Sequence, residues 1–98
     1  MNLSKEAAAS IIEGHTENFR ESLFCLSSGK IATEAARLYV QSRKFFFSES
    51  SGFTDLADML QLSVEAVRHQ LRHEETVCLT EAGLDDVNFA KLVAKWTD

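Results

Sequence analysis

The chain has 98 residues, of which 45% are apolar, and its 15 acidic and 10 basic residues give a formal net charge of −5. A chain of this length can bury roughly 60 to 70% of the surface that its unfolded form exposes. We therefore expect one domain with a core of its own, which needs neither metals nor disulfides. The acidic balance argues against a protein that grips nucleic acid with its whole surface, because neutralising phosphates requires a local excess of Lys and Arg. It leaves room for a confined basic patch.

The N-terminus and the cysteines bear on where the protein works. Residues 1–6 lack the basic and apolar segments of a secretion signal, and no apolar run approaches the roughly 20 residues that span a bilayer. These features favour a soluble, cytoplasmic protein without a membrane partner. Cys25 and Cys78 stand far apart among apolar neighbours and without CxxC spacing. This favours buried free thiols, with a disulfide as the alternative.

The first 28 residues predict helix. The chain contains no proline, so its breaks are expected at glycine- and serine-rich segments. Ser4 is expected to cap a first helix over residues 5–13, with Glu6 in its first turn. The spacing of later apolar residues allows either one long helix to about residue 27, with Gly14 as a weak position, or two shorter ones. The apolar stripe that leaves this choice open consists of Ile12, Phe19, Leu23 and Leu26.

The segment after Gly29 predicts an amphipathic helix that ends in three aromatic residues. Its apolar residues follow the i, i+4, i+7, i+8 pattern, at Ile31, Ala35, Leu38 and Tyr39. Phe45, Phe46 and Phe47 cannot all share one face of a helix, so at least one is expected to anchor the following loop to the core. Residues 48–52 are polar and predict a short surface loop.

The C-terminal half predicts three further helices. Thr54 with Asp55 is expected to start the first, and Ser63 to cap the second, with Glu65 in its first turn. Asp85 and Asp86 are expected to open the last helix, whose apolar stripe is Phe89, Leu92, Val93 and Trp96. Only residues 76–80, with their β-favouring Val77, look like a strand. The whole pattern predicts an all-α single domain of five or six helices.

Residues 53–72, FTDLADMLQLSVEAVRHQLR, resemble a helix-turn-helix of the kind found in region four of sigma factors and in many response regulators. Ala57 is small enough for the crossing of two helices. The core between these helices is expected to contain Leu56, Leu60, Leu62, Val67 and Leu71. Gln61 departs from the family, which usually has glycine at this turn because φ is often positive there. A plain helical hairpin is the alternative interpretation. Residues 33–71 also resemble small phage and prophage proteins of regulator type.

The resemblance implies that the exposed face of the second helix, over about residues 64–73, enters the major groove of DNA. By position, the DNA-binding residues would be Ser63, Val64, Glu65, Arg68, His69, Arg72 and His73. Arg68 and Arg72 stand one helical turn apart and would contact guanine edges or phosphates, with Ser63, Glu65 and His69 refining the register. This basic patch would be extended by Arg37, Arg43 and Lys44 if the preceding helix packs close by.

Two classes of function follow, neither of them enzymatic and neither with a cofactor. Glu65, His69 and His73 have a spacing that suits a metal but lack a further donor, and no catalytic set is evident. The leading hypothesis is a small DNA-binding transcriptional regulator. It would act as a dimer through the N-terminal apolar stripe or the Trp96 helix. The alternative is an acidic adaptor or inhibitor that docks on a protein, such as a phage-type antagonist of a host complex. It predicts an exposed apolar or acidic patch around Glu74, Glu75, Glu81, Asp85 and Asp86.

Overall fold

The computed structural model describes residues 4–29 and 33–97, which form α-helices and no strand. In chain order they are α1 (Lys5–Ser27), α2 (Thr33–Phe47), α3 (Phe53–Met59), α4 (Val64–Glu81) and α5 (Asp86–Thr97). The expected all-α single domain of five or six helices is therefore confirmed, with five helices in the described part. None of the described helices is long and apolar enough to cross a membrane.

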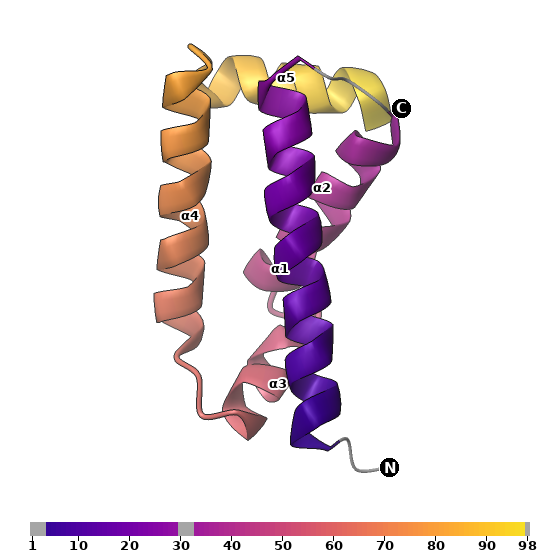
Figure 1. Cartoon of the computed structure of the whole chain (residues 1–98), viewed down its shortest axis with the longest axis vertical. Helices are drawn as coiled ribbons and strands as arrows, with labels where there is room; N and C mark the ends of the chain where they lie inside the picture. Colours follow the sequence, from indigo (N-terminus) through magenta and orange to yellow (C-terminus); the bar gives the residue numbers. More distant parts are fainter. Residues whose placement is uncertain (1–3, 30–32, 98) are drawn as a thin grey trace.

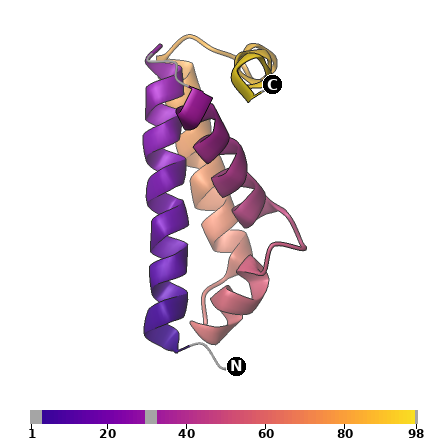
Figure 2. The same ribbon diagram turned by 90° about the vertical axis from the view of Figure 1, so that its right-hand side faces the viewer.

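The helices form an elongated bundle with one short helix at each end. α1 and α4 run in the same direction along the long axis, and α2 returns obliquely between the two ends (Figure 1). α3 closes the end near the N-terminus, whereas α5 lies across the opposite end of the bundle, transverse to α1 and α4 (Figures 1 and 2). The molecule measures 41 × 24 × 20 Å. Its length is close to that of α1, whose 23 residues span about 35 Å at 1.5 Å per residue.

α1 is one continuous helix, which decides between the two alternatives that the sequence leaves open. Ser4 caps it as expected, since its Oγ accepts a hydrogen bond from the amide of Ala7 at 3.1 Å. Gly14 lies exposed in the middle of the helix, where a glycine costs about 1 kcal/mol relative to alanine. Burial of the apolar stripe on both sides of Gly14, at Ile12, Phe19, Leu23 and Leu26, offsets this cost.

α2 contains all three consecutive phenylalanines in its last turn. Phe45 and Phe46 are buried, whereas Phe47 is half-buried, with the Arg43 guanidinium 4.8 Å from its ring centroid. The following loop is held at both ends, because the Ser51 hydroxyl donates to the carbonyl of Phe45, and the rings of Phe45 and Phe46 pack on Phe53 just after the loop. Ile31, the first residue of the expected stripe, lies outside the described residues.

The core is a cluster of aromatic rings where α1, α2 and α3 meet. Phe46 lies at its centre and is fully buried, with the rings of Phe45 and Phe53 each 5.0 Å away and that of Phe19 at 6.4 Å. His15 stacks on Phe45 at 3.9 Å, and its burial lowers the pKa of the imidazole. Edge-to-face and stacked contacts of this kind add to the free energy gained from burial alone.

Two boundaries in the C-terminal half differ from the sequence expectations. α3 begins at Phe53, and its N-cap is Gly52 at φ 88°. Thr54 is therefore not the cap, because the chain leaves the loop through a left-handed residue that only glycine adopts freely. The prediction of a strand at residues 76–80 is wrong as well, since α4 continues to Glu81. Leu71, Glu75 and Leu79 extend its buried face at a spacing of four, and this tertiary contact outweighs the β preference of Val77.

α5 starts and packs as its sequence predicts. Asp85 precedes the helix, and its Oδ1 accepts a hydrogen bond from the amide of Asn88 at 2.7 Å. Phe89 and Val93 are buried, and the Phe89 ring meets that of Tyr39 edge to face at 5.2 Å. The Trp96 side chain lies outside the described part of the chain. α5 makes its main contacts with α2, so α2 holds it on the bundle.

Candidate nucleic-acid interface

The connection between α3 and α4 is a tight turn around one left-handed residue. Ala57 is fully buried, and its carbonyl accepts a hydrogen bond from the amide of Leu62 at 2.8 Å. Gln61 lies between them at φ 56°, the position and conformation at which the resembled family usually has glycine. This conformation costs a residue with a Cβ about 1–2 kcal/mol. Ser63 then caps α4, because its Oγ accepts from the amide of Ala66 at 3.2 Å.

The side chains between the two helices follow the expected pattern with one exception. Leu56, Leu60 and Val67 are partly buried against the core, and Leu71 is buried. Leu62 was expected among them, but 41% of its surface is exposed. The left-handed turn at Gln61 reverses the chain just before Leu62 and directs this side chain outward.

Arg68 lies against the end of α2 rather than on the outer face of α4. Its Nε donates to the carbonyl of Phe46 at 2.6 Å and its Nη1 pairs with Glu49 at 3.1 Å, leaving 20% of the side chain exposed. The last carbonyls of a helix have no partner within that helix, so the Arg68 guanidinium satisfies one of those left at the C-terminus of α2. The same group lies 5.9 Å from the ring centroid of Phe53. Arg68 therefore joins α2, α3 and α4.

The other predicted DNA-binding residues are exposed but face different sides of α4. Ser63, Glu65, His69, Arg72 and His73 are all exposed, and Val64 is partly buried. Arg72 lines a hollow between α2, α4 and α5, whereas His73 lines a groove between α1 and α4. Arg68 and Arg72 thus do not form the exposed pair that their spacing suggests. Among the described residues, no group of three His, Cys, Asp or Glu side chains could hold a metal ion.

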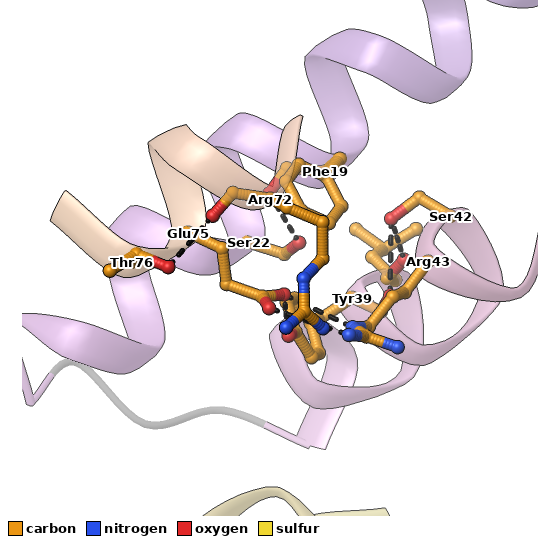
Figure 3. A network of polar contacts seen from close by, with 9 residues as sticks. Phe19, Ser22, Tyr39, Ser42, Arg43, Arg72, Glu75 and Thr76 are labelled. Atoms are coloured by element: carbon orange, nitrogen blue, oxygen red, sulfur yellow. Dashed lines mark hydrogen bonds and ion pairs between the residues drawn. The ribbon is translucent and has the colours of Figure 1, made fainter. Parts of the chain in front are cut away.

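A buried polar network joins α2 to α4 beside Arg72 (Figure 3). Only 5% of Glu75 is exposed, and its carboxylate accepts hydrogen bonds from the Tyr39 hydroxyl and from Arg43, at 3.1 Å from Nε and 3.4 Å from Nη2. Burial, and then the hydrogen bond to Glu75, raise the pKa of the Tyr39 phenol, so it stays a donor at ordinary pH. Sequence reasoning missed this network. The signal for it was the position of Glu75, four residues from Leu71 and four from Leu79.

The network brings basic residues of α2 next to α4. Arg43 lines both the hollow that contains Arg72 and an adjoining one that contains Lys44. We call Arg43, Lys44 and Arg72 the basic strip. Arg37, the third residue expected to extend the patch, is exposed on α2. The acidic patch of the alternative hypothesis is not formed as expected, because Glu75 is buried and Glu74 pairs with Arg20 at 2.7 Å.

Two further expectations concern exposed surface and cysteines. Ile12, Phe19, Leu23 and Leu26 are buried within the bundle, so this stripe cannot form a dimer interface. Phe24, next to it, is 64% exposed and lines the α1–α4 groove of about 430 Å³ together with Val77. Cys25 and Cys78 are free thiols, as the first interpretation expected, but both are half-buried rather than buried.

No family model matches the sequence, and neither does any curated protein or solved structure. The function must therefore be inferred from the geometry of this chain.

Proposed function

We propose that this protein is a small DNA-binding regulator of the cytoplasm, with α3 and α4 as its helix-turn-helix. The α3–α4 turn is the observation that carries the proposal. It combines a buried small residue, Ala57, with a left-handed residue, Gln61, and a serine that caps the second helix. These features occur at the three positions where the resemblance requires them, although Gln61 pays a conformational cost that glycine would avoid.

The basic strip supports a role for Arg72 in contacting phosphate. Arg72 and Lys44 are exposed on neighbouring helices, and Arg43 lies between the two hollows that they line. Asp55, Asp58 and Glu65 are exposed at the α3 end of the molecule and repel phosphate. Affinity for DNA must therefore come from the strip and from His69, and it is expected to be modest and strongly dependent on salt.

Replacing Arg72 with alanine tests this proposal. We expect wild-type protein to bind random-sequence duplex DNA, with an affinity that falls linearly with salt on a logarithmic scale. The variant should bind several-fold more weakly, and its slope should be smaller by roughly 0.9, the value for one phosphate contact. Fluorescence anisotropy of a labelled duplex across a salt series measures both quantities. Arg68 is a poor choice for this test, because its loss would disturb the junction of α2, α3 and α4.

Lys91→Gln is the matched control, since Lys91 is an exposed cation on α5 that does not line the hollow containing Arg72. This variant should keep the affinity and the slope of the wild type. The proposal fails if wild-type protein does not bind at low salt, or if Arg72→Ala and Lys91→Gln bind equally well.

A homodimer is part of the proposal, with the α1–α4 groove as the surface that takes a second copy. One recognition helix buries too little surface for useful affinity. Phe24 and Val77 place exposed apolar surface in the middle of this groove, with Arg20 and His73 toward one end and Glu81 toward the other. A two-fold axis across the groove would pair the aromatic rings and bring each Glu81 near the Arg20–Glu74 pair and His73 of the other copy.

Phe24→Ser should weaken this dimer at least about tenfold, because it removes an aromatic anchor from the centre of the interface. Sedimentation equilibrium over a range of protein concentrations measures the dissociation constant. Val87→Ser is the control, because Val87 is 63% exposed on α5 and lies outside the groove. A wild-type chain that stays monomeric contradicts the dimer, and it would turn the exposed Phe24 into support for the protein-docking alternative.

A further inference from the structure

The hollow between α2, α4 and α5 has the size and the lining of a small-molecule site. Its volume is about 550 Å³, within the range of roughly 300 to 1,000 Å³ that is common for ligand pockets. One wall is apolar and comes mainly from α5, with Phe89, Ala90, Val93 and Ala94, and from Leu79 of α4. The polar groups come mainly from α2 and α4, with Tyr39, Arg43, Arg72 and Glu75, and α5 adds Asp86. Apolar walls with a few convergent polar groups are typical of such sites.

The polar side of the hollow has unused donors and few unused acceptors. The Glu75 carboxylate already accepts from Tyr39 and from Arg43, so its charge is compensated. Nη1 of Arg43 takes no part in these bonds. No hydrogen bond or ion pair joins the Arg72 guanidinium to another described side chain, and Figure 3 shows it extending toward the Glu75 carboxylate and Arg43. A guanidinium offers five N–H donors and no acceptor.

We propose that this hollow binds a small organic anion, a carboxylate with an apolar body, whose head group is held by Arg72 beside Arg43. The planar fork of a guanidinium matches a carboxylate, and the apolar body would lie against Phe89, Leu79 and Val93. Two carboxylates line the hollow. Glu75 is paired with Arg43, so Asp86, in the first turn of α5, is the one whose charge opposes an anion. Removing the charge of Arg72 should therefore weaken binding of the anion, whereas removing the charge of Asp86 should strengthen it.

A ligand held by Arg72 would also remove this guanidinium from DNA. This regulatory consequence rests on the proposed function, whereas the ligand site does not. A compound that binds the hollow would then weaken the association of the protein with DNA, because Arg72 cannot contact the compound and a DNA phosphate at the same time.

Titration of the wild-type protein with 4-phenylbutyrate, followed by ¹H–¹⁵N correlation spectra without DNA, tests the site itself. We expect saturable shifts at the amides of Arg72, Glu75 and Phe89. The neutral amide, 4-phenylbutanamide, and acetate should each bind at least about tenfold more weakly, because one lacks the charge and the other lacks the apolar body. Arg72→Gln should weaken binding of 4-phenylbutyrate about tenfold and Asp86→Asn should strengthen it, whereas Lys91→Gln should leave it unchanged.

The site is overturned if 4-phenylbutyrate gives no saturable shifts at these amides, or if its shifts appear at Phe24 and Val77 in the α1–α4 groove instead. Equal binding of 4-phenylbutanamide, or of the Arg72→Gln variant, would equally exclude an anion site. Since these titrations contain no DNA, a failure here leaves the anisotropy result of the wild type untouched. The two proposals can therefore fail separately.

Discussion

Replacing Phe46 with alanine is expected to lower the free energy of unfolding by about 3–5 kcal/mol, the usual cost of removing a fully buried phenylalanine. Phe46 is fully buried and contacts the rings of His15, Phe19, Phe45 and Phe53. The cavity would open where α1, α2 and α3 meet, so no single helix could move to fill it. Small domains are stable by only about 5–15 kcal/mol, and the variant should therefore be close to unfolding at 37 °C.

Urea denaturation followed by circular dichroism at 222 nm measures this loss. Val87→Ala serves as the control for removal of an exposed apolar side chain, and it should change the free energy of unfolding by no more than about 0.5 kcal/mol. A loss below about 1 kcal/mol for Phe46→Ala would contradict the described aromatic core.

Replacing Glu75 with alanine is expected to cost about 3 kcal/mol, because removing one partner of a buried ion pair leaves the others without compensation. The Tyr39 hydroxyl would lose its acceptor in the core, and Arg43, at 33% exposed, would be only partly able to turn to water. Glu75→Gln keeps an acceptor oxygen and the shape of the side chain. It should therefore cost clearly less than Glu75→Ala.

The neighbouring Glu74 provides a matched control on the same helix. Its pair with Arg20 is more exposed, at 25% and 54% of the two side chains, and such pairs contribute only about 0–1 kcal/mol. Chemical denaturation of Glu74→Ala and Glu75→Ala under identical conditions compares the free energy of unfolding that each variant loses. Equal losses for these adjacent glutamates would show that Glu75 is not the buried centre of the network.

Much of the fold could be predicted from periodicity and capping, because these depend on neighbouring residues. Ser4 and Ser63 cap the helices that the sequence assigns to them, and the apolar stripe of α1 is buried as its spacing predicts. The predictions are wrong where contacts between residues far apart in the sequence determine the local structure. Val77 belongs to α4 because Leu79 is buried against the core, and Thr54 loses the cap position to Gly52, whose left-handed conformation has no signature beyond the glycine itself.

The candidate site was harder to predict than the fold. The spacing of Arg68 and Arg72 indicates which turns of α4 they occupy, but not that an unpaired carbonyl at Phe46 would lie within reach of Arg68. The pairing of Glu75 with Tyr39 joins residues 36 positions apart, and its only local signal is a charged residue at a buried spacing. Both features depend on how α2 packs against α4, which no local pattern specifies.

The attachment of α5 mainly through α2 has a consequence for the dynamics of the native state. Helices with few partners form the units that open at the lowest free energy in native-state hydrogen exchange, well below global unfolding. α5 follows Gly83, which lies at φ 72°, and its release would leave α1 to α4 and the aromatic cluster intact. Opening would uncover the Tyr39 ring and remove the apolar wall of the hollow. Occupancy of the hollow and the protection of α5 amides are therefore expected to rise and fall together.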